Sequence, residues 1–344
     1  MRWGRRGRPD GGGDPTAFWS WWDQEGRTLT SRALAAGEPA GTVEPLAEAV
    51  STVHSELSWE VAPGELSTYV LVVTPAGNPD LRATARRWLL AAPASDETWS
   101  YSDHRLPRTD PESVRLDSIG GAVAFGDVSV TARLNGLRFD VVVHHPRFAD
   151  LIEPARLQVA FLALDLTLGE DDVELWIGTT TATEHPLVDG FGLTALRSVV
   201  QQHAADHVDE DGRPAWILLQ GETPDGPLLA SVQVPLHPAT APSLAVHVAV
   251  AVPFAEMLSD GLPGQHSLAS LRAFEDQVAA TLAAEGRLVA HETAGGLRTI
   301  HAYVDETSDA VDRVRALAGT WPDGTAVVTA RPDPTWAGVA HLSA

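Results

Sequence analysis

The order of short strand and helix patterns is the feature that most constrains the fold of this chain. Apolar side chains at steps of three and four over residues 43–57 predict one face of a helix. Two runs at 57–61 and 69–73, separated by a Pro-Gly turn, predict a hairpin. A second helix is expected from Asn78, and a short strand at 99–101. Helices and strands in this order indicate an α+β fold with helices packed on one sheet face.

The middle of the chain continues this pattern. An Asn-Gly dipeptide between two strand-like runs predicts a second hairpin over residues 128–143. A helix over 155–168, a strand over 174–180 and a helix over 193–207 are expected to follow it. The sequence therefore predicts more α+β structure in this block.

The last third predicts a second module of the same class. Strands are expected at 216–220, 228–234 and 244–252, followed by an amphipathic helix over 267–284. The closing segment, 299–330, has the order strand, helix, strand. That order is the half-repeat of a ferredoxin-like fold with mostly antiparallel strands.

The domain boundary is expected at residues 209–214, where charged residues are followed by Gly and Pro. An N-terminal α+β domain is predicted over 17–208, with a further break between subdomains near 103–118, and a C-terminal α+β domain over 213–344. The first 16 residues, basic at the start and then glycine-rich, are expected to be a disordered tail.

Two residue types are missing, and each absence excludes a class of chemistry. The chain contains no cysteine, which excludes disulfides, thiolate nucleophiles and cysteine-ligated metal. All 24 basic residues are arginine, which excludes a phosphate-loop lysine and a Schiff-base lysine.

The net charge of −22 argues against nucleic acid as a partner, because the phosphate backbone needs a basic surface. The charge is uneven: residues 10–210 carry 13 arginines and 31 acidic residues, whereas 211–344 carry 7 and 15. The longest strongly apolar run, 244–254, is too short to span a bilayer. We therefore expect a cytoplasmic protein with neither a membrane nor a nucleic acid as its partner.

Two histidines form the metal candidate of the sequence. His203 and His207 stand four residues apart on an expected helix, so that both imidazoles share one face. Asp206 between them offers a carboxylate in place of the glutamate of inverted zinc-hydrolase motifs. The competing interpretation is a solvated helix end beside the domain boundary, and it is the one that we favour.

The densest acidic cluster is a candidate interaction surface for a basic partner, and its alternative is a solvated turn. It consists of Glu170, Asp171, Asp172 and Glu174. Trp336 is expected to add an exposed aromatic anchor. Glu275 and Asp276 form another acidic pair, for which a structural role with Arg298 or Arg287 is expected.

Several short blocks in the last third resemble a large bacterial family, the domain of unknown function six-nine-five. They stand in the family's usual order at 261–263, 271–278, 286–289, 296–298, 300–304 and 330–336. The first half resembles the uncharacterised region that often accompanies this domain, through blocks at 18–21, 57–60, 77–78, 145–148 and 169–178. Some relatives resemble the regulator of ribonuclease E activity, type B, a non-enzymatic inhibitor with a ferredoxin-like core. The resemblance implies no catalytic residues.

Together these observations favour a non-catalytic regulatory protein that acts through contacts with a protein bearing a basic face. No catalytic residue and no cofactor is predicted, and the oligomeric state stays open. Two alternatives are a metal-assisted hydrolase, using His203 and His207 or the acids of 170–174, and a small-ligand sensor with a pocket between the halves.

Overall fold

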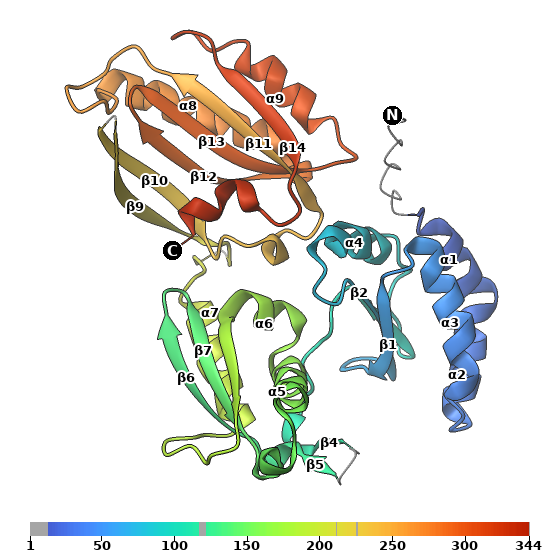
Figure 1. Ribbon diagram of the computed structural model, residues 1–344. Helices are drawn as coiled ribbons and strands as arrows, with labels where there is room; N and C mark the ends of the chain where they lie inside the picture. The colour runs from blue at the N-terminus through green and yellow to red at the C-terminus, as the bar shows by residue number, and fades with distance from the viewer. Residues whose placement is uncertain (1–12, 117–121, 211, 225, 344) are drawn as a thin grey trace, which may run out of the picture. The chain divides into compact units, whose positions relative to one another are not determined.

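The computed structural model describes residues 13–116, 122–210, 212–224 and 226–343 (Figure 1). The chain divides into two compact units between residues 105 and 106. Both contain helices and mostly antiparallel sheets, which confirms the α+β class. Among the described helices, none combines the length and apolar character that a bilayer crossing requires.

Most of the tail predicted for residues 1–16 lies outside the described residues, which begin at Gly13. The amide of Gly13 donates to the carbonyl of Val53 over 2.7 Å. Asp14 Oδ1 accepts from the amide of Thr16, where the first helix begins. The described end of this segment is therefore held to the first unit.

The first unit is built on a three-stranded sheet in the order β1-β2-β3. The predicted hairpin is confirmed: β1 and β2 are antiparallel, and β3 joins β2 in parallel. The predicted helix start is also confirmed, since the Asn78 side chain accepts from the amide of Asp80. The elements are α1 (Thr16–Trp21), η1 (Trp22–Gly26), α2 (Arg27–Ala35), α3 (Ala40–Val53), β1 (Ser58–Pro63), β2 (Tyr69–Thr74), η2 (Pro79–Leu81), α4 (Arg82–Leu90) and β3 (Trp99–Ser102).

Aromatic side chains form the core of this unit. Trp19 stacks on Trp88 of α4 with ring centroids 4.7 Å apart, and Trp22 meets the edge of Trp99 at 4.9 Å. Phe18, Trp22, Trp88 and Trp99 are almost fully buried. The aromatic side chains of segment 18–22 therefore pack into the core of the first unit.

The second unit contains a three-stranded sheet in the order β6-β7-β8, which carries the predicted Asn-Gly hairpin. Helices α5 and α7 supply buried leucines and alanines to its core. The elements are η3 (Pro111–Ser113), β4 (Arg115–Leu116), β5 (Val123–Ala124), η4 (Phe125–Asp127), β6 (Ser129–Asn135), β7 (Arg138–His144), η5 (Pro146–Asp150), α5 (Glu153–Leu168), α6 (Glu170–Trp176), β8 (Ile177–Thr183) and α7 (Leu193–Ala205).

One predicted strand in this part is present, but its predicted start is wrong. The strand expected over 174–180 begins only at Ile177, and the acidic residues before it form the helix α6. Gly169, with φ 83°, ends α5 and redirects the chain into α6. Three acidic residues then occupy the first turn of α6, where the helix dipole favours negative charge.

A six-stranded antiparallel sheet in the order β14-β11-β13-β12-β10-β9 forms the last part of the chain. We call this part, residues 215–342, the C-terminal module. The sequence β11-α8-β12-β13-α9-β14 gives the spatial order 4-1-3-2, so the ferredoxin-like half-repeat that we predicted belongs to a complete ferredoxin-like unit. The hairpin β9–β10 extends this sheet beyond β12. The elements are β9 (Ala215–Thr223), β10 (Gly226–Val234), η6 (Pro238–Thr240), β11 (Leu244–Pro253), α8 (Gln265–Leu282), η7 (Ala283–Glu285), β12 (Gly286–Ala294), β13 (Leu297–Asp305), α9 (Ala310–Ala318), β14 (Val327–Pro332) and η8 (Ala337–Leu342).

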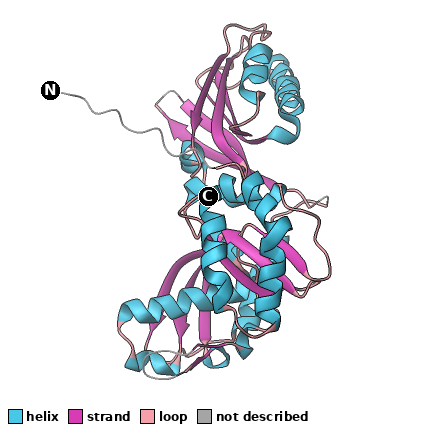
Figure 2. Cartoon of the chain, turned by 90° about the vertical axis from the view of Figure 1, so that its right-hand side faces the viewer, coloured by secondary structure: helices cyan, strands magenta, loops and turns pink. Residues whose placement is uncertain are grey.

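The two faces of this sheet have different coverings. Helices α8 and α9 lie together on one side of it (Figure 2) and bury an aliphatic core that includes Val250 and Ile300. On the other face the short helix η8 packs over Tyr303, with Val339 and Leu342 buried. Because side chains alternate along each strand, the residues next to the aliphatic core positions point to this second face, and these include His301.

Candidate functional site

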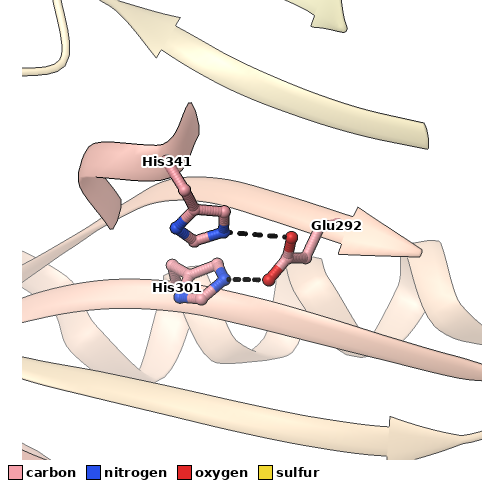
Figure 3. A group of neighbouring side chains, drawn as sticks. All are labelled: Glu292, His301 and His341. Carbon is pink, nitrogen blue, oxygen red and sulfur yellow. Dashed lines mark hydrogen bonds and ion pairs between the residues drawn. The ribbon is translucent and has the colours of Figure 1, made fainter. Parts of the chain in front are cut away.

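Three side chains with metal-ligating atoms meet on the face of the sheet opposite α8 and α9 (Figure 3). They are Glu292 of β12, His301 of β13 and His341 of η8, and their ligating atoms all lie within 4.8 Å of one another. His301 Nε2 is 3.1 Å from Glu292 Oε1, and His341 Nε2 is 3.2 Å from Glu292 Oε2. Among the described residues, this is the only place where three such side chains converge.

Strand register places the first two of these residues. Ala290 is opposite His301, and Glu292 is opposite Thr299, so Glu292 and His301 are diagonal neighbours on one face. A glutamate side chain is long enough to span that diagonal. His301 is 5% exposed and Glu292 22%, so the contact is largely shielded from water.

The third residue is held in place by the packing of the segment that carries it. Trp336 stacks on Tyr303 with ring centroids 4.2 Å apart, and its indole N–H donates to the carbonyl of Leu244. Asp333 accepts hydrogen bonds from the Tyr303 hydroxyl at 2.7 Å and from the amide of Gly338 at 2.8 Å. These contacts fix the start of η8, and His341 follows on the same short helix.

A fourth imidazole, that of His247 in β11, lies behind His301. Its Nε2 is 3.0 Å from His301 Nδ1, and the two rings are nearly parallel. Burial, followed by repulsion from His301, lowers the pKa of His247 to about 4. His247 is therefore neutral at pH 7 and donates or accepts one hydrogen bond through Nε2.

The proton positions follow from the carboxylate. Hydrogen bonding from His301, with a further bond from His341, lowers the pKa of Glu292 against the opposing effect of burial. Ionised Glu292 accepts from both Nε2–H groups. In the tautomer of His301 that has its proton on Nε2, Nδ1 accepts from His247 Nε2–H. The four side chains thus form one continuous hydrogen-bonded row.

Gly338 allows η8 to approach this row closely. A Cβ atom at position 338 would lie 2.6 Å from His247 Nδ1 and 3.0 Å from Arg331 Nη2. Any larger residue would push η8 away from His247 or displace its ring. The approach of backbone to imidazole therefore requires glycine here.

The chemistry of this ligand set is that of a transition-metal site. Two imidazole nitrogens and one carboxylate oxygen suit Zn²⁺ and its neighbours in the first transition row. A metal-bound histidine ordinarily donates its second N–H to a nearby acceptor. With a metal on His301 Nε2, the bond to His247 would reverse its direction, so that His301 Nδ1–H donates to His247 Nε2.

The histidine pair predicted from the sequence lies elsewhere. His203 Nε2 is 2.9 Å from the carbonyl of Leu137, and His207 Nδ1 is 2.8 Å from the carbonyl of His203. The two rings lie 4.4 Å apart beside Trp176. Main-chain carbonyls thus occupy one nitrogen of each ring. Metal binding by this pair stays the untested alternative to the helix end that we favoured.

The residues predicted as an interaction surface are more buried than expected. Trp336 is 3% exposed, so the exposed anchor is corrected to a core residue, because its ring packs on Tyr303. In α6, Glu170 is buried and Asp171, Asp172 and Glu174 are half-buried. All four carboxylates already have partners within the chain, which differs from the solvated cluster expected.

Sequence reasoning missed His247, Glu292, His301 and His341. They are spread over 95 positions, and no local spacing connects them. One usable indication was present: His247 and His301 each interrupt an otherwise apolar or small-residue strand pattern. A strand histidine on the face away from the helices is a candidate ligand once the pairing is known.

The comparisons with known proteins bear on this part of the chain alone. The model of a family of unknown function, DUF695, matches residues 226–341, which include all four residues of the row. The search of curated proteins and the search of solved structures gave no significant match.

Proposed function

We propose that this chain is a non-catalytic regulatory protein whose C-terminal module binds one divalent transition-metal ion. The ligands are Glu292, His301 and His341. The observation that carries the proposal is the convergence of their ligating atoms within 4.8 Å, with a fourth histidine hydrogen bonded behind one of them. Buried imidazoles without such a task would more simply be replaced by apolar residues.

The origin of the ligands supports a regulatory role. Two of them belong to the sheet, and the third belongs to η8, whose His341 is half exposed. An ion bound by all three would tie η8 to the sheet, so that metal occupancy would change the stability and surface of this end of the module. A metal-dependent surface is a means of controlling a contact with another protein.

The identity of the ion follows from the donor atoms. Nitrogen donors favour Zn²⁺, Co²⁺ or Ni²⁺ over Mg²⁺ and Ca²⁺, which prefer sets made of oxygen. The partner that we propose is a protein with a basic face, because the chain carries a net charge of −22.

Titration calorimetry of Zn²⁺ into the metal-free chain of 344 residues tests this proposal. We expect one tight site in the parent protein and loss of that site in Glu292→Gln and in His341→Ala. The matched control is His266→Ala, which removes an exposed histidine of α8 from the same module.

Equal Zn²⁺ binding by the parent and both ligand variants would contradict the metal site. Metal-dependent turnover of an activated ester by the loaded protein, lost in Glu292→Gln, would instead contradict the non-catalytic role.

A further inference from the structure

The outermost strand of the C-terminal sheet, β9, has a free edge. It stands last in the strand order and pairs with β10 in continuous register along its length (Figure 1). The segment before β9 covers only its start, where the amide of Ala215 donates to the carbonyl of His207. Among the described residues, no other segment pairs with the outer edge over 216–223. Every second residue of such an edge directs its N–H and C=O groups outward, where another strand can bind them.

This edge lacks the features that usually prevent strand pairing. Residues 215–221 contain neither a charged residue nor a proline. The opposite edge of the sheet is β14, a shorter strand that ends in Arg331 and Pro332. Short strands, charges and prolines all oppose the addition of a further strand. The edge of β9 is therefore the one that can accept it.

Apolar side chains stand on both faces of β9. Ile217 and Leu219 point to the face that η8 covers, and they pack against the buried cluster there. Trp216 and Leu218 point to the other face and remain 44% and 64% exposed. A strand added beside β9 would place its alternating side chains next to both pairs, so a segment with an apolar centre gains cross-strand contacts.

The two ends of this edge are acidic. Glu210 precedes β9 and Glu222 lies near its end, and both side chains are exposed. Arg213, the only basic residue described between 209 and 224, already has a partner within the chain. A second copy of this chain would bring the same acidic ends and a net charge of −22, which oppose its approach. Charge complementarity instead favours a segment with basic ends from another protein.

We propose that β9 binds an extended segment of a partner protein as an added strand of the sheet. The segment has apolar side chains at its centre and arginine or lysine at its ends, and its backbone supplies the hydrogen bonds. This inference rests on the protein partner of the proposed function, and it adds where and how that partner binds. The metal ligand Glu292 lies on β12, which β10 separates from β9, so the two sites can be tested independently.

Hydrogen exchange and titration calorimetry of the metal-free protein with a blocked peptide test the proposal. The probe is acetyl-Arg-Val-Thr-Val-Thr-Val-Arg-amide, a strand-forming segment with basic ends. We expect 1:1 binding and slower exchange of the amides over 216–223, because pairing protects the amides at the edge. The same peptide with every central amide N-methylated keeps its charges but loses its backbone donors, and its binding should be weaker by about tenfold or more.

Charge reversal tests the acidic ends. The double variant Glu210→Arg, Glu222→Arg should bind the basic peptide about fivefold to tenfold more weakly than the parent does. It should bind a matched peptide with glutamate at both ends more tightly. The control is Glu44→Arg with Glu48→Arg, which makes the same change in net charge on exposed positions of α3 and should leave the binding of both peptides as in the parent.

A second variant tests the apolar contact. Leu218→Ala should weaken the basic peptide about twofold to fivefold. Leu258→Ala, which removes a leucine of comparable exposure from another part of the module, should bind the peptide like the parent. Circular dichroism of all variants establishes that each is folded.

The proposal is overturned if the basic peptide does not bind, if N-methylation leaves its affinity unchanged, or if exchange over 216–223 does not slow. A parent protein that sediments as a dimer, with exchange over 216–223 slowed at higher protein concentration, would also overturn it, because a second copy would then occupy the edge. Loss of Zn²⁺ binding alone leaves the peptide result intact, since the peptide is measured on metal-free protein.

Discussion

His247 Nε2 lies 3.0 Å from His301 Nδ1, and the two imidazole rings are inclined by only 9°. His301 thereby uses one nitrogen toward Glu292 and the other toward a second histidine. The orientation of its ring is fixed from both sides. This arrangement makes His247 a positioning residue for the ligand set.

The first prediction concerns that positioning. His247→Phe keeps a planar ring but removes the hydrogen bond, and we expect Zn²⁺ affinity to fall by about tenfold to a hundredfold, as for other residues that orient a ligand. His247→Gln, whose amide can bond His301, should lose less. Titration calorimetry measures both, and equal affinities for the parent and His247→Phe would contradict the positioning role.

The second prediction concerns pH. The pKa values of His247 and His291 are lowered to about 4, whereas their ordinary value is 6.5. Between pH 6.5 and 4 the unfolded chain binds protons at these residues that the native chain does not. The contribution of these two neutral imidazoles to the free energy of unfolding is therefore complete above pH 6.5. It falls on acidification by about 1.4 kcal/mol per pH unit for each group.

Hydrogen exchange of the β13 amides in metal-free protein, followed as a function of pH, measures this dependence for the C-terminal module alone. His291→Gln should show a smaller pH slope over this window, while the exposed His266→Gln should keep the slope of the parent. A parent slope of zero between pH 6.5 and 4 would contradict the burial of neutral imidazoles.

The third prediction concerns Gly338. An alanine Cβ would lie 2.6 Å from His247 Nδ1, so Gly338→Ala should destabilise the module by about 1–3 kcal/mol, as overpacking does elsewhere. In Gly221→Ala the nearest atom would be 3.8 Å away, and a change below about 0.5 kcal/mol is expected. Urea unfolding of both variants decides the point; equal stabilities would show that η8 can shift without cost.

The fourth prediction concerns Trp336. Its ring is 3% exposed and stacks on Tyr303, so Trp336→Ala should lower the free energy of unfolding by about 3–5 kcal/mol. Trp336→Phe retains an aromatic ring and loses mainly the hydrogen bond to Leu244, worth about 1 kcal/mol. Differential scanning calorimetry compares them, and a cost for Trp336→Ala no greater than for Trp336→Phe would contradict a core role.

Local patterns were enough to predict much of the fold. The two hairpins, the cap at Asn78 and the half-repeat at the end of the chain depend on turn residues and periodicity within short windows. Strand β12 was not predicted, because a bulge between Leu288 and Ala290 interrupts its alternation. Helix α6 was missed for a related reason: one glycine with positive φ separates it from α5.

The candidate site depended on information that no local window contains. Glu292 meets His301 only through the register of β12 on β13, and the turn that leads to His341 passes through Trp336 with φ 56°. Whether Arg298 or Arg287 pairs with Glu275 likewise depends on which face of the sheet each arginine points to. Arg298 contacts Glu275, while Arg287 donates to the carbonyl of Thr240.

The strand order of the C-terminal sheet has a consequence for synthesis on the ribosome. The central strand β11 is paired on one side with β13 and on the other with β14, which ends at Pro332. Strand β11 is therefore translated well before β14, and the edge of β11 that pairs with β14 stays unpaired during that interval. The proposed metal ligands leave the ribosome in the same order. Glu292 and His301 emerge close together, but the set is complete only after His341 has left the exit tunnel.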